Sequence, residues 1–332
     1  MQPAAPAHDA RIPVHVLTGF LGSGKTTFLR HLLEEPDLAD TAVIINEFGE
    51  IGLDHLLVRE VAEDVVLLSS GCLCCGVRDD LVSTLSELLE MARQDSVTPF
   101  RRVVVETSGL ADPAPIIQAV MSAPELIGGY RSGSIITTVD GVSGANSIRN
   151  FAEAAQQVAL ADCVVITKSD LVESWQLDAL ELDLAKVNSS VRSLTSSRDA
   201  MPSADQVLHH GDDRKSHRFA ASHMSVPGVH SHGIKTFTVS VGREVEWPAF
   251  VEWLELLLAA RGQSILRVKG MLSVTGDERP VVIHGVQHVV YPPEYLPRWP
   301  DASPRGWLVF IARNLTRSAI ENSLPSIFAA RP

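Results

Sequence analysis

The sequence lacks the features that would place the protein in a membrane, in an export pathway or on nucleic acid. No apolar run approaches the roughly 18 residues that a membrane span needs. The first residues, MQPAAPAHDARIP, have no basic start followed by an apolar core, so we see no secretory signal and expect a cytoplasmic protein. Basic residues are in deficit, with 28 Lys and Arg against 40 Asp and Glu, and the net charge of −12 argues against nucleic-acid or anionic-membrane partners.

Cysteine is also scarce, and its placement argues against a disulfide framework. Of four cysteines, Cys72, Cys74 and Cys75 fall within four residues, which indicates a metal or redox site in a chain without an export signal. Three neighbouring thiolates can bind one soft or borderline cation and leave a fourth position for Glu47, a histidine, water or a receiving protein. Because no second cysteine pair closes the site, we favour capture and release of a metal. Three redox-active or buried cysteines without metal are the alternative, and Cys163, in an apolar run, is expected in the core.

The strongest motif lies in residues 14–35. Residues 14–18 form an apolar run typical of a buried strand, residues 19–26 (GFLGSGKT) match G-x-x-x-x-G-K-[ST], and residues 27–35 have the leucine spacing of a helix. Glycines let consecutive backbone N–H groups point at phosphate oxygens, and the helix N-terminus adds partial positive charge. We expect Lys25 to reach the β- and γ-phosphates and the Thr26 hydroxyl to ligate Mg²⁺. The predicted phosphate-binding residues are Gly22, Ser23, Gly24, Lys25, Thr26 and Thr27.

A second motif indicates which base is bound. Residues 167–170, Thr-Lys-Ser-Asp, follow an apolar strand and are similar to the N-K-x-D element that reads guanine. The Asp170 carboxylate can accept hydrogen bonds from the guanine N1–H and N2–H groups, and leaving it unpaired would penalise adenine. We therefore predict Lys168 and Asp170 as guanine-binding residues and favour GTP over ATP. Thr167 stands where Asn is usual, which leaves one supporting contact open.

Two further strand-end motifs are expected near the γ-phosphate. Glu106 and Gly109 sit where the Asp-x-x-Gly of a P-loop GTPase would sit, so the carboxylate would hold Mg²⁺ and the glycine amide would contact the γ-phosphate. Residues 46–50 (NEFGE) are expected to form the other moving loop. The residues predicted to act in hydrolysis are Lys25, Glu47, Glu106 and Gly109, and those predicted to hold metal ions are Cys72, Cys74, Cys75, Thr26 and Glu47. No arginine finger or water-orienting Gln is assigned, so slow intrinsic hydrolysis is expected.

The order of apolar segments predicts an α/β fold with two domains. Strand-like runs at residues 14–18, 41–45, 65–68, 102–106, 135–140 and 162–167 alternate with helical patterns such as residues 79–93. This alternation predicts a doubly wound, mostly parallel sheet whose strand ends carry the motifs above. We expect a flexible tail over residues 1–12, a P-loop GTPase domain over 13–195 and a mobile His-rich linker over 196–233. Residues 234–332 are expected to form a smaller α+β domain, with strands at 234–241, 266–274, 281–290 and 307–312 and helices at 247–261 and 316–328.

Histidine is distributed as unevenly as cysteine. Six of the twelve histidines lie between residues 209 and 232, where they either recruit metal weakly or only solubilise the linker. His284 and His288 are four residues apart on an expected strand and would therefore share one face. These two histidines could ligate a metal, but we favour packing or a contact to the first domain.

Taken together, these motifs resemble those of the CobW-type P-loop GTPases, a family related to the urease- and hydrogenase-maturation GTPases that includes metallochaperones. The resemblance rests on GFLGSGKTT, NEFGE, GCLCC, ETSGLADP, TKSD, LRVKGMLSV, IHGVQH and LVFIARN and spans residues 13–328. It implies a G domain that holds GTP and Mg²⁺, cysteines that bind a transition metal, and a C-terminal CobW domain.

We therefore expect a GTP-dependent metallochaperone that binds zinc at the C-x-C-C site and delivers it to a client protein with GTP hydrolysis. The alternatives are a cobalt chaperone for cobalamin biosynthesis or for a cobalt or iron enzyme, and a nucleotide-gated metal buffer without a client. A P-loop kinase with a coincidental cysteine cluster is a more distant one. The expected partners are GTP and GDP, a client, and a second copy in a nucleotide-dependent dimer.

Overall fold

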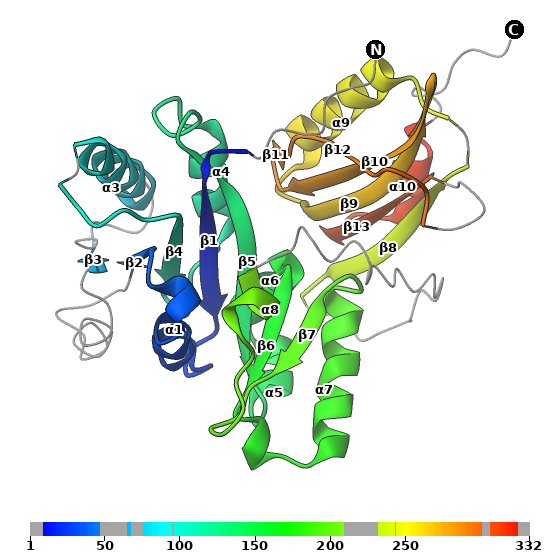
Figure 1. The fold of residues 1–332 in the computed structure, drawn as a ribbon. Helices are drawn as coiled ribbons and strands as arrows, with labels where there is room; N and C mark the ends of the chain where they lie inside the picture. The colour runs from blue at the N-terminus through cyan, green and yellow to red at the C-terminus, as the bar shows by residue number, and fades with distance from the viewer. Residues whose placement is uncertain are drawn as a thin grey trace, which may run out of the picture. The chain divides into compact units, whose positions relative to one another are not determined.

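The structure, a computed structural model, describes residues 9–46, 65–67, 76–94, 96–208, 232–242, 244–300 and 306–324. Within these residues the chain forms a seven-stranded sheet and a six-stranded sheet, both flanked by helices (Figure 1). The chain divides into two compact units, which are described in turn. The first contains β1 to β5, the end of β6, the second half of β7 and the helices α1, α3, α4 and α8. The second contains α5 to α7 and everything from β8 onward.

The seven-stranded sheet has the strand order β3-β2-β4-β1-β5-β6-β7. Its strands are β1 (Ile12–Gly19), β2 (Thr41–Asn46), β3 (Val65–Leu67), β4 (Arg102–Thr107), β5 (Tyr130–Asp140), β6 (Cys163–Thr167) and β7 (Arg192–Thr195). The pairs β3–β2, β2–β4, β4–β1 and β1–β5 are all parallel. Near-continuous valine and isoleucine runs suit strands that are buried on both faces. This arrangement confirms the predicted doubly wound sheet.

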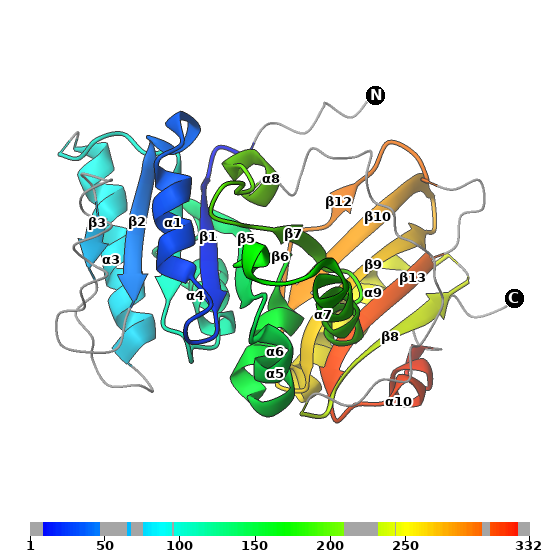
Figure 2. The same ribbon diagram turned by 90° about the horizontal axis from the view of Figure 1, so that it is seen from below.

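Helices cover both faces of this sheet. They are α1 (Lys25–Leu33), the 3₁₀ turn η1 (Pro36–Leu38), α3 (Gly76–Arg93), α4 (Ala114–Ser122) and α8 (Ala204–Leu208). Figure 2 shows α1 on one face and α3 and α4 on the other. Helix α1 buries Phe28, Leu29, Leu32 and Leu33, the one-sided spacing of an amphipathic helix. Among the described helices, none is both long enough and apolar enough to cross a membrane.

The second unit combines three helices with the antiparallel six-stranded sheet. The helices before the sheet are α5 (Gly144–Asn150), α6 (Ala152–Leu160) and α7 (Ser174–Val187), with the 3₁₀ turn η2 (Ser169–Leu171) preceding α7. The sheet has the order β11-β10-β9-β13-β8, with β12 paired to β10. Its strands are β8 (Ile234–Val241), β9 (Ile265–Val274), β10 (Asp277–Val286), β11 (Val289–Val290), β12 (Glu294–Tyr295) and β13 (Gly306–Arg313), and its helices are α9 (Trp247–Arg261) and α10 (Arg317–Glu321). It confirms the predicted smaller α+β domain.

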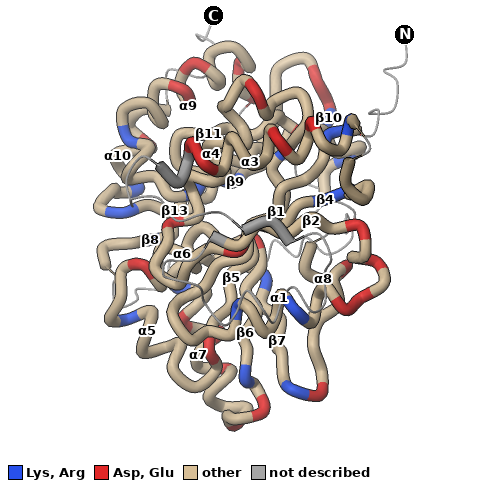
Figure 3. Tube along the Cα trace, turned by 90° about the vertical axis from the view of Figure 1, so that its left-hand side faces the viewer, with Lys and Arg blue, Asp and Glu red and all other residues tan. Residues whose placement is uncertain are grey.

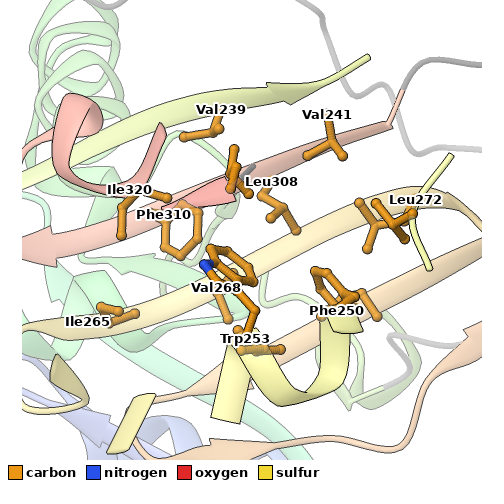
Figure 4. Packing of buried hydrophobic residues seen from close by; sticks show 14 of the residues in the cluster. Val239, Val241, Phe250, Trp253, Ile265, Val268, Leu272, Leu308, Phe310 and Ile320 are labelled. Carbon is orange, nitrogen blue, oxygen red and sulfur yellow. The ribbon is translucent and has the colours of Figure 1, made fainter. Parts of the chain in front are cut away.

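One face of this sheet carries the apolar core of the second unit. Phe250 and Trp253 from α9 pack against Val268 of β9 and Phe310 of β13, and Ile320 of α10 joins them (Figure 4). These positions alternate along the strands, as a sheet with one face against helices requires.

Polar residues on the opposite face of β9 join the sheet to α6 and β6. Arg267 donates hydrogen bonds to the Leu160 carbonyl and to Asp162, and Lys269 Nζ lies 3.4 Å from the same Asp162 carboxylate. Burial, with the neighbouring Arg267 charge, lowers the pKa of Lys269 to about 8, although Asp162 opposes this shift. Two buried cations thus share one carboxylate, so Asp162 is needed to compensate charge inside the unit.

The structure corrects three sequence predictions. The expected linker begins too early, because α8 at its start is packed: the Ser134 hydroxyl donates to the Leu208 carbonyl at 3.0 Å. The strand expected over residues 281–290 is broken by a turn at Gln287, where φ is 48°, so His284 and His288 do not share a strand face. The closing helix expected over residues 316–328 is the short α10, which begins after its N-cap Thr316; residues beyond 324 lie outside the described chain.

Candidate nucleotide site

The loop between β1 and α1 has a backbone that favours glycine. Gly22 and Gly24 have φ values of 73° and 85°, in the left-handed region that residues with a Cβ rarely adopt. Gly24 is also the N-cap of α1, and the first turn of α1 contains no acidic residue. Glycine has no side chain to cap the helix, and an anion bound at this loop would meet the partial positive charge at the N-terminus of α1.

Lys25, the first residue of α1, reaches back over the loop. Its Nζ donates to the Gly19 carbonyl at 3.0 Å and to the Phe20 carbonyl at 3.4 Å. Gly19 itself packs tightly on β5, where a Cβ would lie 2.3 Å from Thr138 Oγ1. The loop is thus fixed at its start by β5, with one positive charge held beside it.

Thr26 and Glu106, the two residues predicted on the Mg²⁺ side, are brought together by the sheet. Glu106 is only 4% exposed near the end of β4, in register with Leu17 of β1. The Thr26 hydroxyl donates to Glu106 Oε1 at 2.7 Å. A hydroxyl and a carboxylate are the hard oxygen donors that Mg²⁺ prefers, so the chemistry of this pair fits a magnesium ion.

Gly109 lies directly against the phosphate-binding loop. A Cβ at this position would be 2.6 Å from Leu21 Cδ2 and 2.9 Å from the Leu21 backbone nitrogen. Only glycine allows the chain after β4 to approach the loop this closely. Thr27, in contrast, is exposed on α1.

Buried threonines form a row beneath the loop that sequence reasoning missed. Thr18, Thr107, Thr138 and Thr167 lie at or near the carboxyl ends of the neighbouring strands β1, β4, β5 and β6, and each is at most 6% exposed. Their hydroxyls connect through short contacts: Thr107 donates to Thr18 Oγ1 at 2.8 Å, and Thr138 Oγ1 lies 2.7 Å from Ser23 Oγ in the loop. The signal in the sequence that could have indicated this row was a threonine close to the end of each of these four apolar strands.

Thr167, which departs from the usual Asn, has its own role in this row. Its hydroxyl lies 2.8 Å from the Ser23 carbonyl, to which it donates, and 3.3 Å from the Val139 carbonyl. The contact that the sequence left unassigned at this position is therefore a hydrogen bond from the Thr167 hydroxyl to the phosphate-binding loop. Lys168, the next residue, has a φ of 55° and begins η2, in which the Asp170 side chain is exposed. No described contact tests their predicted guanine-binding role.

The predicted metal ligands Cys72, Cys74, Cys75 and Glu47 all lie outside the described residues. Within the described part of the chain, no group of three or more His, Cys, Asp or Glu side chains could hold a metal. Cys163 is buried in β6, as expected for a core residue, and burial raises the pKa of its thiol to about 11. His288 packs against the end of α9, with Nδ1 3.1 Å from the Leu258 carbonyl.

Comparison with known proteins matches both halves of the chain. Residues 13–195 match the family described as CobW/HypB/UreG, nucleotide-binding domain, and residues 234–327 match the cobalamin synthesis protein cobW C-terminal domain. The chain belongs to the CobW-type family of P-loop GTPases. The two family regions leave residues 196–233 between them.

Two curated CobW-type relatives and one solved structure are similar over nearly the whole chain. The zinc chaperone YjiA of Escherichia coli strain K12 is 31% identical, covering 93% of this chain and 96% of its own length. The zinc chaperone CobW of Pseudomonas aeruginosa is 30% identical, with 96% and 92% covered. The crystal structure of zinc-bound YjiA GTPase from E. coli superposes with a TM-score of 0.68 at 26% identity, covering 96% of this chain and 99% of that chain.

Proposed function

We propose that this CobW-type protein hydrolyses GTP and uses its nucleotide state to bind zinc and deliver it to a client protein. The observation that carries the nucleotide half is the partly buried Thr26–Glu106 hydrogen bond beside the glycine N-cap of α1. The metal half rests on the C-x-C-C sequence and on whole-length similarity to proteins named zinc chaperones.

On the nucleotide side, each protein group has a distinct task. The amides at the start of α1 bind phosphate oxygens, and the Lys25 ammonium group neutralises charge that builds up between the β- and γ-phosphates. Mg²⁺ held by Thr26 and, directly or through water, by Glu106 would neutralise the same phosphates. Gly109 brings its backbone to the loop, where its N–H group would contact the γ-phosphate. The exposed carboxylate of Asp170 would accept the guanine N–H groups.

On the metal side, three thiolates from Cys72, Cys74 and Cys75, with Glu47 as a fourth ligand, would hold zinc without redox chemistry. Loss of the γ-phosphate after hydrolysis would release the loops at Glu47 and Glu106 and weaken the metal site. Linkage then requires that zinc tighten GTP binding as much as GTP tightens zinc binding, typically by ~1–3 kcal/mol.

A competitive metal titration of the full-length protein tests this proposal. Zn²⁺ and Co²⁺ are titrated against a chromophoric chelator with Mg²⁺ and a non-hydrolysable GTP analogue, with Mg²⁺ and GDP, and without nucleotide. Tight one-to-one zinc binding in the GTP-like state alone supports the switch. A larger gain for Co²⁺ would make cobalt the cargo, and equal zinc affinity in all three states would favour a metal buffer.

Cysteine variants test which residues form the zinc site. Replacing Cys74→Ser and Cys75→Ser together should abolish tight zinc binding and leave GTP binding intact, whereas Cys163→Ser, which changes a buried thiol elsewhere, should retain both. Unchanged zinc affinity in the double variant would refute the site. The nucleotide-dependent dimer is part of this proposal, and light scattering with and without the GTP analogue tests it.

A further inference from the structure

The outer side of α7 and the turn before it carry large apolar side chains in solvent. Leu171, Trp175 and Leu182 are 65%, 66% and 65% exposed. Trp175 and Leu182 are seven residues apart, with the exposed Ala179 between them at the fourth position. Positions i, i+4 and i+7 lie on one side of a helix, so these residues form a continuous stripe, here called the α7 stripe (Trp175, Ala179 and Leu182, with Leu171 at its start).

Packing against the rest of the second unit holds α7 with the stripe on its outer side. The opposite side of α7 is buried through Leu180, Leu184 and Val187, and the Val187 carbonyl accepts a hydrogen bond from the Thr236 hydroxyl of β8 at 2.7 Å. A capping box formed by Glu173 and Gln176 defines where the helix begins. The stripe therefore cannot turn inward without losing this packing, and its apolar area is left for another molecule.

The stretch of chain between Lys168 and Lys186, which carries the stripe, is acidic. Residues 169–185 contain five carboxylates and no lysine or arginine. Asp183 is paired with Arg149 and Lys186, whereas Glu173, Asp178 and Glu181 form no ion pair with any described residue. Acidic positions recur along α7 in Figure 3. An apolar stripe flanked by uncompensated carboxylates attracts a partner with basic flanks and repels one with acidic flanks.

We propose that the α7 stripe docks an amphipathic helix of a partner protein, with apolar residues at the seam and lysine or arginine beside it. The heptad-like spacing suits helix-on-helix packing, and an exposed tryptophan is a typical anchor of such contacts. A second copy of this chain would bring the same carboxylates face to face, and nucleic acid or an anionic membrane would meet the same repulsion. The residues of the stripe belong to neither the phosphate-binding motif nor the C-x-C-C motif, so this inference goes beyond the proposed function and does not depend on it.

A designed peptide pair tests the proposal on the full-length protein. The probe is a fluorescently labelled helix of about three heptads with leucine at the seam and lysine at the flanks, and its counterpart carries glutamate in place of lysine. We expect the basic peptide to bind with a blue shift in tryptophan emission and the acidic peptide not to bind. Replacing Trp175→Ala and Leu182→Ala together should weaken binding at least about tenfold and remove the shift.

Two further variants separate the stripe from general attraction to an acidic protein. Asp178→Asn with Glu181→Gln should weaken binding and flatten its salt dependence, whereas Leu256→Ala, at a 63% exposed leucine on α9, should change nothing. Circular dichroism melting should be the same for all variants, because each changed side chain is exposed. Failure of the basic peptide to bind, equal binding of both peptides, or full affinity in the Trp175→Ala, Leu182→Ala variant would overturn the proposal.

Discussion

The row of buried threonines makes Thr167 the most informative position to change. Thr167→Val keeps the side-chain shape and removes only the hydroxyl that donates to the Ser23 carbonyl at 2.8 Å. Removing one partner of a buried hydrogen bond costs about 1–3 kcal/mol. We expect the free energy of unfolding to fall by that amount, because Thr167 is only 6% exposed and water cannot easily replace the donor.

For a matched substitution in the same sheet, Thr41→Val, we do not expect the free energy of unfolding to fall. Thr41 is also buried, but its hydroxyl makes no hydrogen bond to any described residue. Thr41→Val should therefore leave stability unchanged or raise it, since a buried polar group without a partner is itself unfavourable. Thr167→Ser, which retains the hydroxyl, should lose less stability than Thr167→Val.

Urea unfolding followed by circular dichroism measures these effects, and a fluorescent GDP analogue measures nucleotide affinity. The contact joins two parts of the protein and not the protein to the nucleotide, so we expect stability to change more than affinity, with Kd rising by less than about tenfold. Equal losses in Thr167→Val and Thr41→Val would refute the reasoning, because shape and not the hydroxyl would then explain the result.

Two other predictions follow from close packing and from buried charge. Gly109→Ala should weaken GTP-analogue binding in an equilibrium titration, because its Cβ would meet Leu21 backbone atoms, whereas Gly128→Ala, with no atom within 4 Å, should leave binding unchanged. Lys269 has a pKa lowered to about 8 from 10.5, so between these values the unfolded chain holds a proton that the folded chain has lost, and stability from this residue rises with pH. Urea unfolding of wild type and Lys269→Met should show the wild type gaining stability over the variant from about pH 8 to about pH 10, and a constant difference would contradict the assignment.

The sequence was most informative where a motif and an apolar run adjoin. The β1–loop–α1 segment was predictable because the glycine pattern, the strand before it and the helix after it specify one geometry. The threonine row was not predictable, because threonine is also an ordinary strand residue and its hydroxyl contacts depend on which strands become neighbours. Glu106 reaches Thr26 because β4 lies next to β1 in the sheet. The motifs alone establish only that Glu106 lies near the end of a strand and Thr26 near the start of a helix.

The corrected elements were misjudged for local reasons. Six of the ten residues 281–290 are valine or isoleucine, and they continue on both sides of Gln287 and His288, so the two-residue turn did not stand out in the pattern. Helix α8 has only five residues and lies in a segment of mixed polarity, and tertiary packing, including the Glu35 carboxylate that accepts from the Ala204 N–H at 3.0 Å, stabilises it.

The packing of α6 and α7 against the six-stranded sheet restricts how segments of this family can be recombined. The family region of the nucleotide-binding domain extends to residue 195, yet residues 141–164 and 168–193 share a compact unit with the C-terminal sheet. A chimaera joined within residues 196–233 would place Asp162 of one parent against position 267 of the other, and a mismatch there would leave a charge buried without its partner. A junction near residue 140 keeps both members of that pair in the same parent, but it moves the boundary between parents to the Thr167–Ser23 and Ser134–Leu208 hydrogen bonds, so either crossover requires parents that match at the contacts it divides.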